Sequence, residues 1–405
     1  MNEMLAGNQI QLLRNGSSYF PALAAAIAQA KQTIYLQTYI FEVDAAGNLI
    51  ADALKAAAQR GVTVRVLLDG FGCKDMPSDF LKAFKKAGVQ VMFYRPKISP
   101  WSFKKNRLRR MHRKVAVIDE KIGFVGGINI IDDSNVPSNL PPRVDYAVQV
   151  QGALLPSMTE SVQKLWRRIK ITHLQPQTID INSDNDSAKM AKKAVTKGAQ
   201  QNGNKNDNKN ANKNISAAFI LRDNLLHRRD IESAYLKAIN AAKSEIIIAN
   251  AYFLPGRRFR QALIKAANRG VTVQLLLQGR MEYFLMLATH AFYTVFLKSG
   301  INIVEYRKSY IHCKVAVIDS TWATVGSSNI DPFSMLLARE ANIVVQDSAF
   351  ASELRAEIMQ SIQKESVAVS AQEWLKRNTF KRALSWLMYG VVKVILGVIG
   401  HSNER

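Results

Sequence analysis

The feature that most constrains this chain is an internal duplication. The phrase HRKVAVID at residues 112–119 returns as HCKVAVID at residues 312–319. Two further pairs of segments match, AKQTIYLQTYIF with AKSEIIIANAYF and GVTVRVLLDG with GVTVQLLLQG. The offset between the copies drifts from 212 through 209 to 200 residues, so a few insertions separate otherwise similar halves. Two copies indicate a duplicated domain rather than a solenoid of many repeats.

Each half alternates strand-like and helix-like patterns. In the first half, β-branched and apolar runs predict strands at 34–39, 62–68 and 89–94. Helical spacing predicts helices at 48–60 and 78–86, the second starting on a Ser78 cap. The second half repeats this order, with strands at 245–250, 271–277 and 301–306 and helices at 257–269 and 283–298. We therefore predict an α/β fold class, with two α/β/α domains whose mixed sheets are flanked by helices and which form a pseudo-twofold pair.

A polar stretch separates the halves. Residues 182–214 are rich in Asn, Lys, Gly and Asp and have almost no large apolar side chains. Such a segment cannot bury enough surface to offset its chain entropy, so we predict that it is disordered. The expected organisation is an N-terminal domain at 1–175, a linker at 176–216, a C-terminal domain at 217–370 and a basic and apolar segment at 371–405. A tether of this length allows the two domains to pack face to face.

The repeated phrase places two chemically useful side chains on one face of a strand. Side chains alternate along a strand, so His112 and Lys114 point the same way, as do His312 and Lys314. One such pair is usually a surface accident. The same pair occurring twice, with the same residues downstream, indicates a catalytic site.

A small-residue turn follows each of these strands. GGIN ends at Asn129, and GSSN contains Ser327 and ends at Asn329. Backbone amides and an Asn side chain in such a turn can hold a phosphate oxygen. Asp119 and Asp319 end the preceding strands, where turn-stabilising and catalytic-support roles both remain open.

A twofold pair of halves would bring one His, one Lys and one Asn from each copy to a shared seam. Phosphodiester chemistry uses such a set. One imidazole attacks phosphorus and forms a phosphohistidine, and the other protonates the departing alkoxide and later accepts the proton of the incoming hydroxyl. The Lys and Asn side chains neutralise charge on the equatorial oxygens, so no metal and no cofactor is required.

A nucleophilic histidine also needs a carboxylate that holds it in one tautomer. Glu340 lies 28 residues after His312, and Asp145 lies 33 residues after His112. Each carboxylate opens an apolar strand at the matching point of its half. These two residues are therefore the candidate orienting groups.

At these residues the sequence resembles the phospholipase D superfamily, whose signature is HxKx₄D followed by GGxN or GSxN. Both copies match, and the resemblance runs from about Asn8 to Asp347. The segments FVGGINIIDD, AYFLPGRRFRQAL and WATVGSSNIDPFSMLLAREANIVV are similar to those of bacterial cardiolipin synthases, in particular the B type without N-terminal membrane spans.

The resemblance implies two phospholipase D-like domains and a specific reaction. A phosphatidyl group passes from one phosphatidylglycerol to the glycerol headgroup of another, and glycerol is released. It further implies that His112 is the nucleophile and His312 the acid/base, a choice that the symmetry of the two motifs leaves open.

Charge points to an anionic partner. The chain has 55 Lys and Arg against 32 Asp and Glu, a net charge of +23. Residues 101–114, which include His112, alone hold seven basic residues and two aromatics. This segment is suited to gathering anionic headgroups, although nucleic acid phosphates would be attracted as well.

The C-terminal region favours a lipid surface. Residues 383–400 carry one charge, Lys393, and follow a cluster of basic residues. We expect a monotopic anchor, with a packed helix or a true span as alternatives. The apolar run at 281–296 is by default a flanking core helix, with a lid that touches acyl chains as the alternative.

The expected location is the cytoplasmic face of the bacterial cell membrane. The N-terminal residues have no apolar core segment, so we predict no signal peptide and no N-terminal span. Cys73 and Cys313 have no metal-ligand or disulfide-framework spacing, which fits a reducing compartment.

Three functions follow in order of support. The first is a cardiolipin synthase acting on anionic phospholipids such as phosphatidylglycerol. The second is a phosphodiesterase or nuclease with the same site, which the apolar C-terminal segment disfavours, so no nucleic acid partner is expected. The third is a non-catalytic membrane adaptor, which the intact His, Lys and Asn sets disfavour. The identity of the second lipid, phosphatidylglycerol or phosphatidylethanolamine, and the oligomeric state remain open.

Overall fold

The computed structural model describes residues 3–96, 109–137, 139–174, 214–280, 284–376, 385–392 and 394. Most of the predicted linker, 176–213, lies outside the described residues, as do residues 101–108 of the basic segment. Strand β8 begins at Ile215, inside the last residues of that predicted linker.

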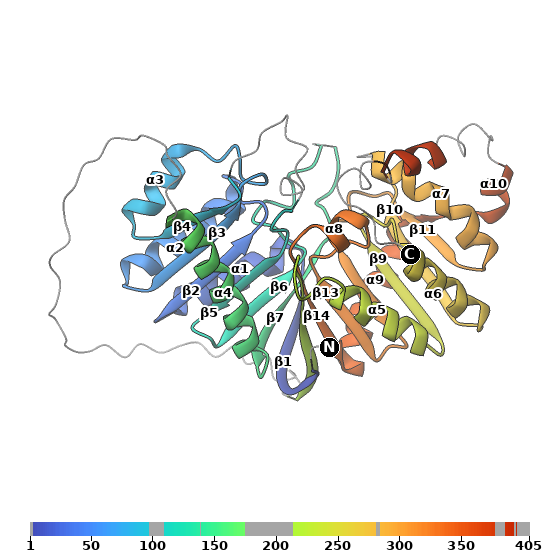
Figure 1. Cartoon of the computed structure of the whole chain (residues 1–405), viewed down its shortest axis with the longest axis horizontal. Helices are drawn as coiled ribbons and strands as arrows, with labels where there is room; N and C mark the ends of the chain where they lie inside the picture. Colours follow the sequence, from blue (N-terminus) through green and yellow to red (C-terminus); the bar gives the residue numbers. More distant parts are fainter. Residues whose placement is uncertain are drawn as a thin grey trace, which may run out of the picture.

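The strands of both halves join in one mixed sheet of fifteen strands, in the order β15-β11-β10-β9-β12-β13-β14-β8-β1-β7-β6-β5-β2-β3-β4 (Figure 1). The order β1-β7-β6-β5-β2-β3-β4 of the first half is repeated by β8-β14-β13-β12-β9-β10-β11 in the second. The halves meet where β1 and β8 pair antiparallel. The predicted pair of mixed sheets is therefore confirmed, and the two sheets are continuous.

The bounds of the strands agree closely with the predicted ones. The first half contains β1 (Leu5–Arg14), β2 (Thr33–Thr38), β3 (Thr63–Asp69), β4 (Gln90–Tyr94), β5 (Lys114–Ile118), β6 (Ile122–Gly126) and β7 (Tyr146–Gly152). The second half contains β8 (Ile215–Arg222), β9 (Glu245–Asn250), β10 (Thr272–Gln278), β11 (Asn302–Tyr306), β12 (Lys314–Ile318), β13 (Trp322–Gly326), β14 (Glu340–Gln346) and β15 (Ser366–Ala368).

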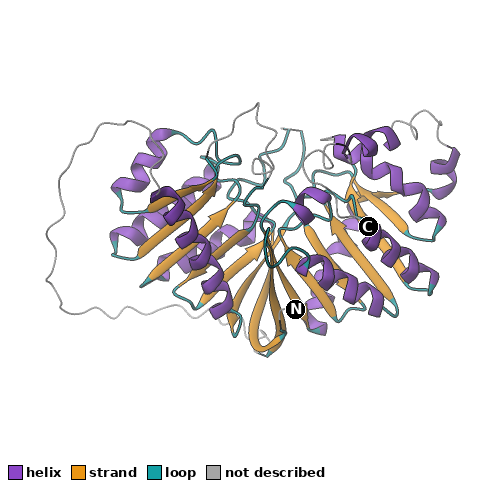
Figure 2. Cartoon of the chain, viewed as in Figure 1, coloured by secondary structure: helices purple, strands orange, loops and turns teal. Residues whose placement is uncertain are grey.

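Helices cover both faces of the sheet (Figure 2). One face carries α1 (Asn15–Gln29), α2 (Ala45–Gln59) and α3 (Ser78–Lys86) in the first half, and α5 (Asp230–Ala241), α6 (Arg257–Asn268) and α7 (Phe284–Lys298) in the second. The other face carries α4 (Leu155–Leu174) and α9 (Ser348–Glu365). The short helices α8 (Pro332–Leu336) and α10 (Ala371–Lys376) complete the second half.

The core explains why the halves behave as one body. Strand β2 shows the pattern, because Ile34 and Leu36 face the core under α1 and α2 while Tyr35 faces the opposite core. That opposite core runs without interruption beneath α4 and α9 and takes side chains from both halves. Burial of apolar surface therefore holds the two copies together across the β1–β8 junction.

The single difference between the repeated phrases has a structural cause. Arg113 points away from the His and Lys face, donating from Nε to Gln37 Oε1 at 2.8 Å and from Nη1 to Ser161 Oγ on α4 at 2.7 Å. Its counterpart Cys313 is a free, buried thiol in the core shared by the two halves. The exchange of Arg for Cys thus alters the packing behind the strand and leaves the reactive face unchanged.

One prediction about helix ends is wrong. Ser78 does not cap α3, because the cap position is Pro77 and no side chain bonds the first amides there. The helix instead has Asp79 in its first turn and Lys85 and Lys86 in its last, charges that complement the helix dipole.

The apolar segments of the second half pack against each other. From residue 288 onward α7 supplies buried side chains to the core, as expected of a flanking helix. Residues 385–392 are helical and lie against it, with the rings of Phe292 and Tyr389 4.9 Å apart. Within the described residues, no helix combines the length and the apolar character needed to cross a bilayer.

Candidate active site

Each histidine lies at the crossing between the halves, two residues before a strand. His112 precedes β5 and His312 precedes β12. The amide of His112 donates to the carbonyl of Arg339 at 3.0 Å, and the amide of His312 donates to the carbonyl of Val144 at 2.8 Å. Arg339 and Val144 immediately precede the two candidate carboxylates. The backbone of each histidine is therefore bonded to the carboxylate-bearing segment of the other half.

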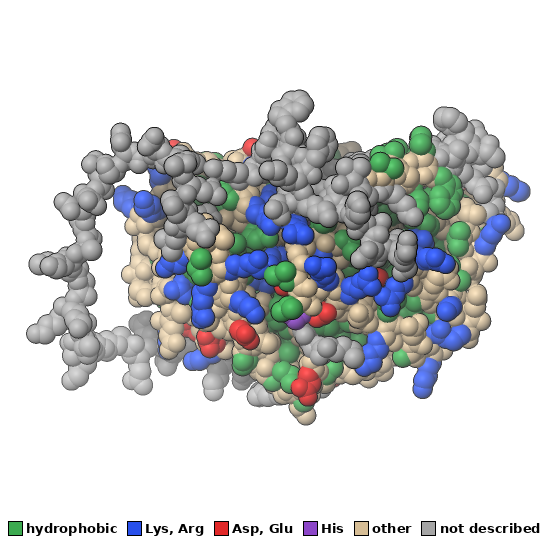
Figure 3. All heavy atoms as spheres, viewed as in Figure 1, with side chains coloured by type: hydrophobic (Ala, Val, Ile, Leu, Met, Phe, Trp, Pro, Cys, Tyr) green, Lys and Arg blue, Asp and Glu red, His purple; other side chains and the backbone are tan. Residues whose placement is uncertain are grey.

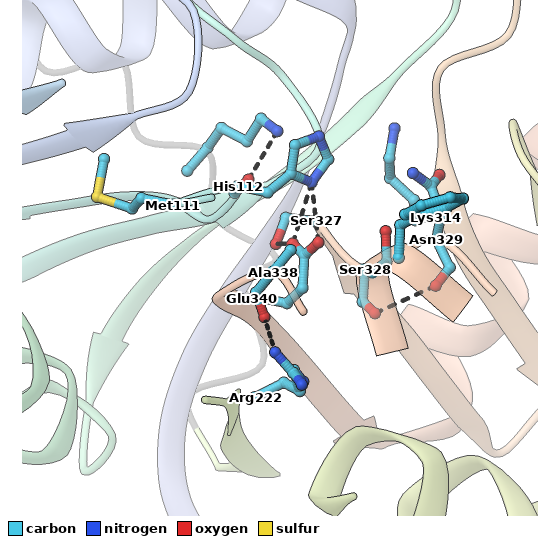
Figure 4. A network of polar contacts seen from close by, with 12 residues as sticks. Met111, His112, Arg222, Lys314, Ser327, Ser328, Asn329, Ala338 and Glu340 are labelled. Atoms are coloured by element: carbon cyan, nitrogen blue, oxygen red, sulfur yellow. Dashed lines mark hydrogen bonds and ion pairs between the residues drawn. The ribbon is translucent and has the colours of Figure 1, made fainter. Parts of the chain in front are cut away.

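The side chains follow the same crossed arrangement, and Figure 4 shows one of the two pairs, His112 with Glu340. His112 Nδ1 lies 3.0 Å from Oε1 and 3.1 Å from Oε2 of Glu340, and His312 Nδ1 lies 2.7 Å from Oδ2 of Asp145. The sequence located each carboxylate by its distance from the histidine of its own half, whereas the structure pairs them across the seam. Because Nδ1 is occupied in both rings, Nε2 is the atom available for chemistry. Neither half contains a complete site.

The small-residue turns fit the two carboxylates differently. Ser327 Oγ donates to Glu340 Oε2 at 2.5 Å, which adds a second hold on that carboxylate. At the matching position is Gly127, where an added Cβ would lie 2.2 Å from Asp145 Oδ1. The shorter Asp brings its carboxylate closer to the backbone, so only glycine fits beside it.

The two lysines are buried and bond to the histidine backbone. Lys114 Nζ donates to the carbonyl of His112 at 2.7 Å, and Lys314 Nζ makes the same bond to the carbonyl of His312. Burial, together with the charge of Lys314, lowers the pKa of Lys114 to about 7. Burial also lowers the pKa of Lys314, while Asp145 opposes that shift. The charge of Lys314 thus disfavours the charge of Lys114, and a bound phosphate would relieve this repulsion.

The two asparagines of the turns lie beside this cluster. Asn129 Oδ1 accepts from the amide of Ile40 at 3.1 Å, which leaves its NH₂ group available as a donor. Oδ1 of Asn329 is buried and has no hydrogen-bond partner in the described part of the chain. Figure 4 shows the Asn329 side chain next to Lys314, where it would meet the same anion.

Burial biases the site toward uncharged imidazoles. It lowers the pKa of His112, although Glu340 raises it, and it lowers the pKa of His312 well below the usual value with the help of both lysines. Burial raises the pKa of Asp145 to about 6. A bound phosphate would add negative charge and so favour the protonated form of one imidazole, which is the form that a general acid requires.

The structure does not bring Asp119 and Asp319 to this cluster. They stand at the far ends of β5 and β12, with φ angles of 50° and 51°. The carboxylate of Asp119 accepts from the amides of Lys31, Gln32 and Thr33 at 2.6–2.8 Å. That of Asp319 accepts from the amides of Lys243, Ser244 and Glu245 at 2.8–2.9 Å. Of the two roles left open by the sequence, the geometry favours turn stabilisation.

Three residues near the histidines were missed by the sequence analysis. The ring of Tyr39 lies edge-on to that of His112 with centroids 5.0 Å apart. Asp133 and Arg143 line a small pocket beside His312. The sequence does contain a sign of them, because each differs from its counterpart in the second copy. A difference at one position of a repeat indicates that the two copies have different roles there.

Taken together, a duplicated α/β/α scaffold with one His and one Lys from each copy at the seam defines the phospholipase D class of site. In the part of the chain that is described, no group of three or more His, Cys, Asp or Glu side chains could hold a metal ion. The chain belongs to the cardiolipin synthase family of PLD-like proteins, because the family model described as "Cardiolipin synthase, PLD-like domain" matches residues 23–140 and 235–362.

Similar proteins agree with this assignment. "Cardiolipin synthase B" of Salmonella typhimurium is 37% identical over 395 residues, covering 97% of this chain and 90% of that protein. Its namesake in Escherichia coli strain K12 is 35% identical over 405 residues, with the same two coverages of 97% and 90%. "Cardiolipin synthase 1" of Bacillus cereus is 28% identical over 382 residues, covering 93% of this chain and 71% of that protein.

A solved structure confirms the fold. The crystal structure of phosphatidylserine synthase from Haemophilus influenzae Rd KW20 superposes with a TM-score of 0.66 at 14% identity, covering 98% of this chain and 97% of that one. At this level of identity the likeness concerns the architecture alone.

Proposed function

We propose that this chain is a cardiolipin synthase that transfers a phosphatidyl group between two phosphatidylglycerol molecules. The observation that carries the proposal is the crossed His–carboxylate arrangement at the seam, in a chain that matches cardiolipin synthases over almost its whole length. The products are cardiolipin and glycerol, and the intermediate is a phosphohistidine.

The reaction proceeds in two balanced steps. Nε2 of His112 attacks phosphorus, the P–O bond to glycerol breaks, and His312 gives its proton to the departing oxygen. The glycerol hydroxyl of a second phosphatidylglycerol then attacks phosphorus, its proton passes to His312, and the N–P bond breaks. Lys114 and Lys314 stabilise charge on the non-bridging oxygens in both steps.

The assignment of His112 as nucleophile is supported by its surroundings. Glu340 contacts it with both oxygens and is itself held by Ser327, so this imidazole is firmly oriented. His312 borders a small pocket whose interior has room for a group of about the size of one hydroxyl. An alcohol next to the acid/base and opposite the nucleophile is the arrangement that in-line displacement needs.

Vesicles of phosphatidylglycerol test the proposal. The purified full chain should release glycerol and form cardiolipin in equal amounts, measured by mass spectrometry of the lipids and an enzymatic glycerol assay. Phosphatidic acid as the sole lipid product would identify a hydrolase instead. Adding phosphatidylethanolamine to the vesicles distinguishes the two acceptor lipids that the sequence left open.

Contact with an anionic membrane surface, at the cytoplasmic face, is part of the same proposal. Residues 385–394 expose the apolar side chains of Trp386, Leu387, Val391 and Val394. Figure 3 shows Lys and Arg side chains in a band across one face of the molecule, with apolar side chains above its right end. Basic groups beside exposed apolar ones support peripheral binding. The same vesicles, floated on a density gradient, should carry the protein with them, and protein that stays at the bottom would contradict this part.

The pH dependence of the reaction should follow Lys114. Because its pKa in the free protein is lowered to about 7, its positive charge is present below that pH and lost above it. We expect kcat/KM for phosphatidylglycerol to decline above pH about 7. In kcat at saturating substrate the decline should move to higher pH, because the bound phosphate favours the ammonium form. Lys114→Arg should also move the decline in kcat/KM upward, since arginine stays charged. A kcat/KM that is constant to pH ~9 would contradict the lowered pKa of Lys114.

A further inference from the structure

The pocket beside His312 has a composition of its own. Its lining residues are Ile128, Asn129, Ile131, Asp133, Arg143, Asp145 and His312. Its empty space is about 200 Å³ when the open mouth is counted, but the centre of a water molecule can reach only about 10 Å³ of it, so the interior admits one hydroxyl-sized group. Two isoleucine side chains thus share the wall with a carboxylate and a guanidinium that the reaction steps above do not use.

The duplication provides an internal comparison for these two charged residues. Counting from the Asn of each turn, Asp133 corresponds to Phe333 in the second copy. Counting back from the carboxylates that orient the histidines, Arg143 corresponds to Ala338. The Asp and Arg pair therefore exists on the His312 side only, and apolar residues occupy the equivalent positions on the other side.

A second difference between the copies leaves more room at His312. The ring of Tyr39 packs on His112, with a centroid distance of 5.0 Å. Its counterpart in the repeat is Ala251, whose amide donates to the carbonyl of Cys313, next to His312. The imidazole of His112 is thus covered by an aromatic ring, and that of His312 has only a methyl group at the equivalent position.

The polar groups of the pocket form only some of the hydrogen bonds that they could form within the protein. Asp133 Oδ2 accepts from the amide of Gly16 at 2.5 Å, which leaves its second oxygen as an acceptor. Arg143 donates to the carbonyl of Asn135 from Nη2, but its Nε is buried without a partner among the described residues. With the NH₂ group of Asn129, the pocket offers acceptors and donors together. Hydroxyl groups, which both donate and accept, match such a mixed set.

We propose that this pocket receives one hydroxyl group of a vicinal diol whose other atoms lie at its open mouth, first the glycerol unit of the departing headgroup and then that of the acceptor headgroup. Asp133 accepts from a glycerol hydroxyl, Arg143 and Asn129 donate to the hydroxyl oxygens, and the reacting oxygen lies at His312. The inference rests on the proposed function, in which both alcohols are glycerol units, so that one pocket serves both steps.

An exchange reaction isolates this pocket from the membrane acceptor. Phosphatidylglycerol and isotope-labelled free glycerol should yield labelled phosphatidylglycerol and unlabelled glycerol. In this exchange the P–O bond to the old glycerol breaks as the bond to His112 forms, and the new glycerol oxygen then displaces His112. One proton leaves His312 in the first step and returns to it in the second, so no other reactant is consumed.

The unmodified enzyme and Asp133→Asn together test the proposal. The wild type should use glycerol at least ~10-fold more efficiently in kcat/KM than 1-propanol, which lacks the extra hydroxyls. Asp133→Asn should raise KM for glycerol by about 10-fold, change kcat by less than ~3-fold and reduce the preference over 1-propanol. Asp132→Asn is the matched control, because this neighbouring carboxylate bonds Ser134 and does not line the pocket.

The outcomes separate this inference from the proposed function. A wild type that makes cardiolipin but uses glycerol and 1-propanol equally would overturn the proposal that this pocket binds glycerol. It would leave the proposed function intact. A folded Asp133→Asn enzyme with unchanged KM and preference would do the same. A wild type that forms neither cardiolipin nor labelled phosphatidylglycerol would overturn both. Because Asp133 also bonds Gly16, the Asp133→Asn variant could fail to fold. In that case the comparison of glycerol with 1-propanol in the wild type decides, together with Arg143→Gln, for which the same rise in KM is expected.

Discussion

His112→Ala is expected to lower kcat for cardiolipin formation by ~10⁴-fold or more, because it removes the nitrogen that forms the N–P bond. His312→Ala should lower kcat by ~10²–10⁴-fold, since glycerol then departs and enters without general acid/base help. Both effects are read from cardiolipin and glycerol produced by vesicles of phosphatidylglycerol.

A matched control separates these losses from a general effect of removing a histidine. His227 also pairs with a carboxylate, Asp230, at 2.7 Å, but it lies just before α5 and takes no part in the crossed arrangement. His227→Ala should therefore keep activity within ~2-fold of the wild type. Near-normal activity of His112→Ala or His312→Ala would remove the paired mechanism.

Glu340→Gln is expected to lower kcat by ~10²–10⁴-fold, even though Glu340 lies in the opposite half from the nucleophile it orients. The amide keeps the shape of the side chain but removes the charge that stabilises a positively charged imidazole ring. It should slow formation of the phosphohistidine, the step that also fails in His112→Ala. Asp145→Asn should instead affect the acid/base step, as His312→Ala does.

This crossed pattern is the part of the prediction that distinguishes the structure from an arrangement within halves. If each carboxylate served the histidine of its own half, Glu340→Gln would resemble His312→Ala. Combining Glu340→Gln with His112→Ala should add little to the single loss, because the two residues act as one unit. Glu357→Gln, which removes a carboxylate that pairs with Arg14 between the halves and not with either catalytic histidine, serves as control and should leave kcat unchanged.

The repeated phrases predicted the reactive residues and most of the elements around them. The run VAVI after each His-x-Lys is a buried strand in both halves, β5 and β12, because a near-continuous apolar run suits a sheet covered on both faces. Local pattern was sufficient here because burial and strand period act over a few neighbouring residues.

The pairing of the carboxylates could not be predicted in the same way. Glu340 and Asp145 stand at similar distances along the chain from the histidines of their own halves, and nothing local indicates which histidine each one meets. The choice is made by the junction of β1 with β8, which turns the two copies so that the segment before each carboxylate bonds to the opposite histidine. That junction is a tertiary contact between residues about two hundred positions apart.

The pocket shows a third kind of limit. Asp133 stands in a segment that was recognised as characteristic, FVGGINIIDD, but its sequence neighbours do not reveal that it borders His312. The histidine belongs to the other copy, so the two meet only after the halves have packed. Comparison of the copies, Asp133 against Phe333, is the signal that remained in the sequence.

The proposed mechanism requires the two imidazoles to act on one phosphorus in different roles. The most direct test uses the p-nitrophenyl ester of phosphatidic acid, whose leaving group needs no protonation. His312→Ala should release a burst of p-nitrophenolate equal to the amount of enzyme, followed by almost no turnover, and the lipid should remain attached to His112 through an alkali-stable, acid-labile bond. His112→Ala should give no burst. A burst from His112→Ala, or lipid attached to His312, would contradict this mechanism.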